Sequence, residues 1–151
     1  MQNLVSKKEE EERRLKALAE YRILGTKPES CYDDITKIAA TTCNVPISLM
    51  TLVDKDKQWF KSKIGLQISE TRRDWSFCTH AIKENSPLII HDAFQDERFI
   101  NNPLVTGDPK IRFYAGFPLR NSDGNKLGTL CVIDRKPGNL TTQQFNIMEL
   151  L

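Results

Sequence analysis

The sequence predicts an α+β domain in which helices pack against an antiparallel sheet, and three observations support this prediction. The 151 residues are 39% hydrophobic and 28% charged, which fits one compact domain rather than two. Apolar runs of strand length follow one another with short turns between them, which is typical of antiparallel pairing. Segments with helical spacing stand near both ends of the chain.

The first part of the chain predicts two helices. Residues 7–22 contain strong helix formers without Gly or Pro, with acidic residues before basic ones. Because its first two turns carry few apolar residues, we expect this helix either to project into solvent or to act in dimerisation or signalling. Gly25 predicts its end. Thr26 and Glu29 form a capping-box pattern that predicts the start of a second helix, which Asn44 closes.

The middle of the chain predicts strands around one short helix. Residues 46–54 are apolar on both alternating faces, which indicates a central strand covered on both sides. Residues 57–63 mix two aromatic residues with lysines and predict an outer strand. After a polar connector, residues 75–82 predict a short helix, and residues 88–91 predict a brief strand.

The last third predicts an irregular cover, a hairpin and a helix. Residues 92–109 are rich in turn formers, so we expect either a loop that covers a site or a plain connector. Residues 113–119 and 127–134 predict two strands, and the Asp-Gly pair between them predicts a tight hairpin turn. A second capping box at Thr141 opens a final helix.

Composition excludes several classes of partner. Lysine and arginine total 22 against 20 acidic residues, a net charge of +2 that is too weak to indicate nucleic acid or an anionic membrane. No apolar run is long enough for a membrane span, and the charged start does not resemble a secretory signal. We therefore expect a cytoplasmic protein. The four scattered cysteines predict reduced, mostly buried thiols.

Seven ordered blocks of the sequence carry a family resemblance. They are Tyr21–Thr26, Pro46–Asp54, Gln58–Ser62, Trp75–Ile82, Asn102–Val105, Arg112–Leu119 and Leu127–Asp134. Together they resemble the GAF domain family, in the subgroup found at the amino terminus of bacterial sensor histidine kinases and diguanylate cyclases. The resemblance implies a central antiparallel sheet of five to six strands, with helices on one face and a loop-rich cover on the other. It also implies a small-molecule pocket beneath the cover and terminal helices that dimerise.

The candidate ligand site centres on residues 75–82, which combine aromatic rings, a thiol, hydroxyls and an imidazole. Ser76 is placed to cap the short helix and leave its amides facing a ligand. Residues on two strands that resemble the family's pocket floor, Arg112 among them, are secondary candidates. The predicted ligand-binding residues are Trp75, Ser76, Phe77, Cys78, His80, Phe99, Tyr114, Thr129 and Cys131. The alternative is ordinary core packing, with Ser76 acting only as a cap.

Enzymatic and cofactor sites receive little support from the sequence. Cys78 and His80 are two residues apart, so on a helix they point in different directions and do not chelate one ion. GAF-like methionine sulfoxide reductases use several cysteines around the pocket, and that pattern is absent here. The further motifs of bilin photoreceptors and the charged signature of cyclic-nucleotide-binding GAF domains are absent too. We expect no catalytic residue and no metal, and the sequence identifies no cofactor.

The resemblance predicts a non-catalytic sensory module. Residues 1–25 form a terminal helix for dimerisation or signalling, and residues 26–151 form the domain. Because the last helical pattern is unbroken at Leu151, we expect the chain to continue into an output domain of the histidine kinase or diguanylate cyclase type. Ligand occupancy then reaches that output through the terminal helices of a homodimer. The alternative is a structural dimerisation module without a ligand.

Overall fold

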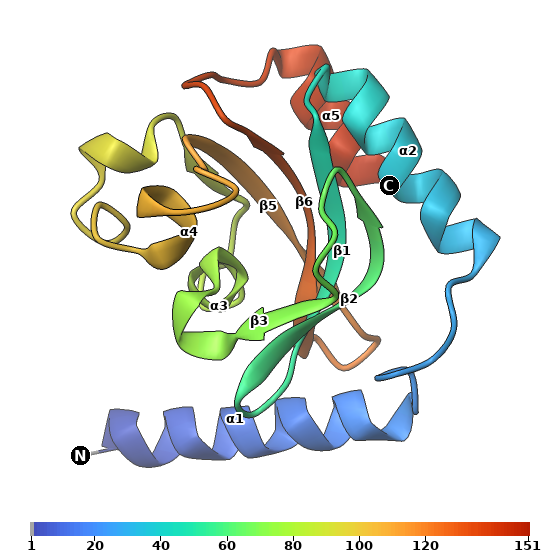
Figure 1. The fold of residues 1–151 in the computed structure, drawn as a ribbon. Helices are drawn as coiled ribbons and strands as arrows, with labels where there is room; N and C mark the ends of the chain where they lie inside the picture. The colour runs from blue at the N-terminus through green and yellow to red at the C-terminus, as the bar shows by residue number, and fades with distance from the viewer. Residues whose placement is uncertain (1) are drawn as a thin grey trace.

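The computed structural model describes the backbone of residues 2–151 and the side chains of residues 7–151. Six strands form one sheet of order β3-β2-β1-β6-β5-β4, and every neighbouring pair is antiparallel. Helices lie on both faces (Figure 1), so the predicted α+β fold is confirmed. The elements are α1 (Gln2–Glu20), α2 (Ser30–Cys43), β1 (Ile47–Val53), β2 (Lys57–Ile64), β3 (Glu70–Arg72), η1 (Arg73–Trp75), α3 (Phe77–Ala81), β4 (Leu88–Ile90), η2 (Ala93–Gln95), α4 (Pro103–Thr106), β5 (Phe113–Arg120), β6 (Lys126–Asp134) and α5 (Thr142–Leu150).

Two helices, α2 and α5, cover one face of the sheet (Figure 1). Alternate side chains of β5 and β6 point toward them, which is the arrangement that the period of two in a strand produces. Thr141 and Gln144 form the predicted capping box at the start of α5. The buried cluster on this face contains Ala39, Cys43, Phe113, Ala115, Phe117, Leu130, Val132 and Met148.

The opposite face carries the cover, which consists of α3, α4, two short 3-10 helices and their connections. The larger buried cluster lies here, and it takes Ile47, Leu49 and Val53 from β1, as the alternation predicted. The predicted hairpin between β5 and β6 is confirmed, with Gly124 at φ 82° in its turn. Within residues 2–151, we find no helix that is both long and apolar enough to cross a membrane.

The terminal helix α1 ends earlier than predicted and packs on the domain. It stops at Glu20, and Arg22 takes a left-handed conformation at φ 50°, ahead of the predicted stop at Gly25. Ile23 and Leu24 pack against the cluster that α1 itself contacts, so the chain must turn before them. That cluster contains Ala17, Leu18, Leu52, Trp59 and Leu127. The expectation of a helix that projects into solvent is therefore wrong for its second half.

The start of α2 also differs from prediction. Glu29 occupies the capping position without a side-chain hydrogen bond, and the Thr26 hydroxyl instead donates to the carbonyl of Ile23. The Lys61 ammonium explains the difference, because it forms an ion pair with Glu29 and donates to the Thr26 hydroxyl, which occupies both members of the predicted box. Asn44 ends α2 in a left-handed conformation, as predicted.

Two further expectations about the sheet and the cover were wrong. β2 is not an outer strand, because β3, which the sequence did not predict, pairs with its first residues. Five consecutive residues of β2, 58–62, are buried. The stretch 92–109 is not uniformly irregular, since it contains η2 and α4, and Asn102 caps α4 through the amide of Leu104.

Candidate ligand pocket

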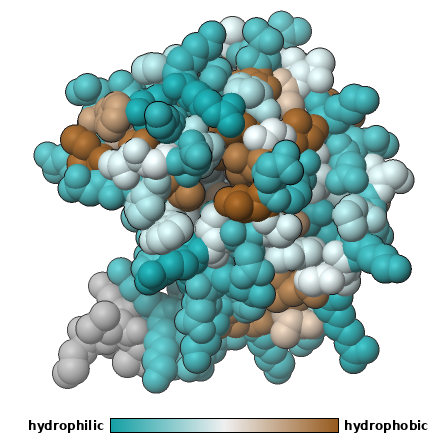
Figure 2. Space-filling model, in the orientation of Figure 1, coloured by the Kyte–Doolittle hydropathy of each residue, from teal (hydrophilic) through white to brown (hydrophobic). Residues whose placement is uncertain are grey.

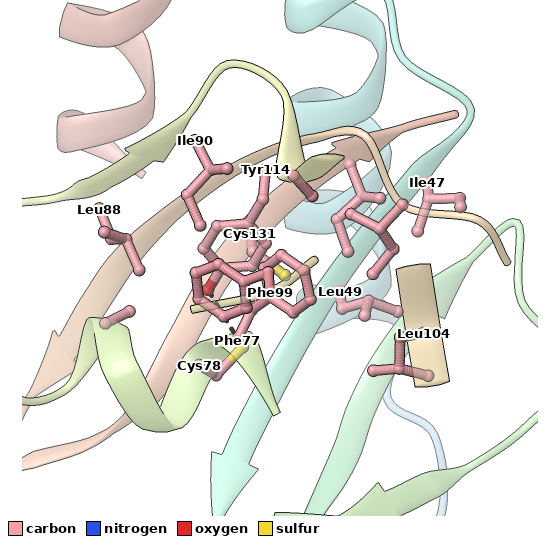
Figure 3. Close-up of a cluster of buried hydrophobic side chains, with 14 of the residues drawn as sticks. Ile47, Leu49, Phe77, Cys78, Leu88, Ile90, Phe99, Leu104, Tyr114 and Cys131 are labelled. Carbon is pink, nitrogen blue, oxygen red and sulfur yellow. Dashed lines mark hydrogen bonds between the residues drawn. The ribbon is translucent and has the colours of Figure 1, made fainter. Parts of the chain in front are cut away.

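The candidate pocket lies between the sheet and the cover (Figure 3). The sheet contributes Leu49, Gln58, Phe60, Thr71, Tyr114, Cys131 and Ile133, and the cover contributes Leu66, Ile68, Phe77, Cys78, Leu104, Pro109 and Ile111. The cavity is about 20 Å³, which is roughly enough for one water molecule. The lining is almost entirely apolar, so the space suits an uncharged group.

The most polar part of the lining surrounds the thiol of Cys78. Tyr114 donates its hydroxyl to the Cys78 sulfur at 3.2 Å, and Thr129 donates its hydroxyl to the same atom at 3.0 Å. Cys131 lines the same cavity. These groups come from α3, β5 and β6, and each is almost completely buried. The pocket therefore holds a dense set of weak donors around one sulfur atom.

These hydrogen bonds change the acidity of the two thiols in opposite directions. Burial raises the pKa of Cys78, but hydrogen bonds from Cys131, Thr129 and two further hydroxyl groups outweigh burial and lower that pKa to about 6. Burial and the donation to Cys78 raise the pKa of Cys131 well above its usual value. Cys43, which lies on the other face, has burial alone acting on it, and its pKa rises to about 11.

Ser76 connects α3 to the sheet. Its hydroxyl accepts from the amide of Thr79, which confirms the predicted cap, and it donates to the Gln58 side-chain oxygen at 2.7 Å. The Gln58 amide nitrogen in turn donates to the Thr71 hydroxyl at 2.7 Å. Ser76 makes these two hydrogen bonds and is not part of the cavity lining, so it holds α3 in place rather than facing the cavity.

Aromatic packing fixes the inner surface of the cover. The rings of Phe77 and Phe99 stack with centroids 4.1 Å apart, and Phe77 also packs on Tyr114 at 5.2 Å. His80 contacts Phe99 edge-on, with ring centroids 4.9 Å apart. Burial lowers the pKa of His80. Trp75 is partly buried and packs against the outside of the cluster, where Arg72 lies over its ring.

Of the nine predicted ligand-binding residues, the structure places four in the cavity wall: Phe77, Cys78, Tyr114 and Cys131. The other five, Trp75, Ser76, His80, Phe99 and Thr129, are not part of the cavity wall. Arg112, a secondary candidate, donates to the carbonyl of Val105 and stacks on the ring of Phe94, so it holds the cover instead. Within the cover, Phe99 is buried, whereas Phe94 and Ile100 are exposed.

Sequence reasoning missed the wall that β2 and β3 contribute. Gln58 and Phe60 face the cavity from β2, and Thr71 faces it from β3. Gln58 and Phe60 are two residues apart, so they lie on the same face of β2, but the sequence did not show that this face is covered. The lysines in the same strand obscured it, because they suggested a solvent-exposed strand.

The segment before α3 is tied to the terminal helix by ionic contacts. Glu11 of α1 accepts from Arg14 at 2.9 Å and forms a second ion pair with Arg73 of η1. Arg14 is buried and donates to the carbonyl of Val53 at 2.6 Å. Partial burial raises the pKa of Glu11, but the two arginines outweigh it and lower the pKa to about 2. The carboxylate is thus ionised at neutral pH and joins α1 to the base of the pocket helix.

Comparison with known proteins places this arrangement in a family. A cyclic di-GMP phosphodiesterase of Pseudomonas aeruginosa is 39% identical over 142 residues, which are 93% of this chain, and the chain spans 24% of that protein's length. A free methionine-R-sulfoxide reductase of Thermoplasma acidophilum has the same fold at 11% identity, with a TM-score of 0.65 over 80% of this chain and 84% of that one.

A domain of a two-component sensor histidine kinase described for Sinorhizobium meliloti also shares the fold. It is 15% identical, with a TM-score of 0.61 over 81% of this chain and 83% of that one. The sequence profile of the GAF domain matches residues 27–151, which include the whole sheet and every residue of the cavity wall. The chain therefore belongs to the GAF domain family.

Proposed function

We propose that this chain is a non-catalytic regulatory module whose pocket binds a small molecule and whose terminal helices pass the occupancy to an attached output domain. The observation that carries the proposal is the ionic link between Glu11 of α1 and Arg73, the first residue of η1, which precedes the pocket helix α3. Arg73 also accepts, through its carbonyl, from the Thr79 hydroxyl of α3. A displacement of α3 therefore acts directly on the contact that holds α1.

The size of the cavity sets a condition on the ligand. With room for roughly one water, the pocket must widen to admit a metabolite, and the cover must move to allow this. A ligand biases the position of α1 only through its different affinity for the closed and widened arrangements. An uncharged, mainly apolar molecule suits the lining, because the described cavity wall offers no charged side chain.

The output we propose is an enzyme of cyclic di-GMP turnover. The 39% identical relative is named a cyclic di-GMP phosphodiesterase, and the chain matches a quarter of that protein's length. This refines the expected output, since a diguanylate cyclase makes the dinucleotide that such a phosphodiesterase degrades. In this arrangement the module regulates the enzyme and takes no part in its chemistry.

The second candidate is a structural module that dimerises without a ligand, and the small cavity favours it. Exposed apolar side chains are available for helix contacts, including Ile38 on α2 and Leu150 on α5. Under this alternative a homodimer forms through the terminal helices, and the pocket remains a packed core.

Native mass spectrometry of the purified chain separates the two candidates. We expect a bound small molecule that is released on unfolding, and we expect a Leu49→Trp variant, which fills the cavity from β1, to lack it. An Ile38→Trp variant, changed on the far face, is the matched control and should retain the molecule. A wild-type spectrum without any added mass, together with unchanged output of the full-length protein carrying Leu49→Trp, would exclude ligand control. A dimer in that spectrum would then support the structural module.

A further inference from the structure

The fold brings two of the four cysteines together and keeps the other two apart. Cys78 on α3 and Cys131 on β6 line the same cavity and belong to the same buried cluster. Cys31 is exposed on α2, and Cys43 is buried on the opposite face of the sheet. The paired thiols are 53 residues apart in the sequence, so the contact depends on the fold alone.

The surroundings of Cys78 favour its ionised form over the thiol. The Tyr114 and Thr129 hydroxyls both donate to this sulfur, and hydrogen bonds to a thiolate stabilise it. The Thr51 hydroxyl lies 3.2 Å from the Thr129 hydroxyl and extends the group of hydroxyls around the sulfur. The thiolate is the nucleophilic form of cysteine, whereas Cys43 lacks such donors.

The size and lining of the cavity limit which oxidants can reach Cys78 and Cys131. Cys78 and Cys131 are only 2% and 0% exposed, and the space beside them holds roughly one water. Hydrogen peroxide is uncharged and needs little more room than water. Glutathione disulfide is large and charged, and the apolar lining excludes it. The half-exposed side chain of Ile68 belongs to the lining, so one side of the cavity lies at the protein surface.

We infer that Cys78 and Cys131 form a dithiol site that hydrogen peroxide oxidises to a disulfide. The Cys78 thiolate attacks one peroxide oxygen, the O–O bond breaks, and two electrons pass from sulfur to peroxide. This leaves Cys78 as a sulfenic acid and releases hydroxide, which becomes water by taking up a proton. The Cys131 sulfur then attacks the Cys78 sulfur, the S–O bond breaks, and a second water carries away the Cys131 proton.

Oxidation changes the contacts that position α3. The disulfide removes the sulfur acceptor that Tyr114 and Thr129 use, and it ties α3 covalently to β6. A disulfide requires the two sulfur atoms to approach to about 2 Å, so its formation rearranges the side chains packed around Cys78. This inference goes beyond the proposed function and does not depend on a small ligand, so either can fail without the other.

Peptide mapping of the intact chain after peroxide treatment tests the inference. Each cysteine falls in its own tryptic peptide: residues 23–37, 38–55, 74–83 and 127–135. The chain is treated with hydrogen peroxide, and iodoacetamide is added together with the denaturant to block thiol exchange. We expect peptides 74–83 and 127–135 to appear cross-linked and two hydrogen atoms lighter than their sum. Peptide 38–55, with the buried Cys43, should stay alkylated.

Two variants assign the order of steps. In Cys131→Ser, the sulfenic acid on Cys78 has no partner, so dimedone should label peptide 74–83. In Cys43→Ser, the matched control for loss of a buried thiol, the cross-link should form as in wild type. The inference is overturned when a peroxide dose that fully oxidises the exposed Cys31 leaves Cys78 and Cys131 as completely alkylated as Cys43. This outcome is read from the wild-type chain and does not require any variant to fold.

Discussion

Replacing Gly116 with alanine should displace Tyr114 from the pocket wall. Tyr114 and Gly116 lie two residues apart on the same face of β5, and the tyrosine ring leans across the glycine. A Cβ at Gly116 would lie 2.1 Å from the Tyr114 hydroxyl oxygen and 2.6 Å from the ring carbon that bears it. Because Gly116 does not have a positive φ, its backbone accepts alanine without strain. The effect of Gly116→Ala is therefore one of packing alone.

The magnitude follows from two losses. Forcing a methyl group into a packed core costs about 1–3 kcal/mol. Moving the tyrosine ring also breaks its hydrogen bond to the Cys78 sulfur, which contributes about 1 kcal/mol. We expect Gly116→Ala to lower the free energy of unfolding by about 3 kcal/mol, which corresponds to a fall in Tm of roughly 6–12 °C for a chain of this size.

Urea unfolding measures this loss, and two further variants test its cause. Gly138→Ala is the matched control, since its new Cβ would meet only Phe113 at an ordinary 3.6 Å, so we expect a change within about 0.5 kcal/mol. The double variant Gly116→Ala, Tyr114→Phe lacks the hydroxyl oxygen that lies closest to the new methyl group. We therefore expect it to lose less stability than the two single variants lose in total. Equal stability of Gly116→Ala and Gly138→Ala would refute the packing argument.

Three other predictions concern charge and acidity. The pKa of Glu11 is lowered from 4.5 to about 2, so its contribution to stability is present above pH 4.5 and lost as the pH falls toward 2. After allowance for solvent exposure, we expect Glu11 to add about 1–2 kcal/mol to the free energy of unfolding at pH 7 relative to pH 3, as measured by urea unfolding. This contribution should be absent in Glu11→Gln. Lys61→Met should cost about 1–3 kcal/mol in the same assay at pH 7, because Lys61 is buried and pairs with Glu29; an unchanged midpoint would contradict this. Ultraviolet absorbance of thiolate in folded Cys31→Ser protein should show Cys78 ionising near pH 6 and Cys43 near pH 11; a single transition above pH 8 would contradict the role of the hydroxyl donors.

Local signals in the sequence predicted most of the fold. The apolar alternation in residues 46–54 predicted a central strand, and β1 is buried along its whole length. The hairpin between β5 and β6 and the cap of Ser76 on α3 followed from turn and capping residues, whose effect depends on near neighbours. Such features are readable because the interactions that form them lie within a few residues.

Features that depend on distant contacts were not predictable in the same way. Arg14 resembles a surface charge in its helix, yet it is buried because the Val53 carbonyl and Glu11 satisfy it. Lys61 suggested an outer strand, although Glu29 neutralises it inside the protein. In the cavity, the aromatic and thiol residues of α3 were recognisable, but Gln58 was not, because only the fold places it opposite Ser76.

The two outer strands of the sheet have a consequence for association. β3 and β4 are three residues each, so the sheet presents very short edges at both sides. Short edge strands offer few unpaired backbone groups to another chain and so resist strand-to-strand aggregation. In Figure 2 most of the surface on the side shown is hydrophilic, with a few apolar side chains near its centre. Contacts with other domains or copies are thus directed to helical surfaces, where side chains rather than backbone hydrogen bonds determine the partner.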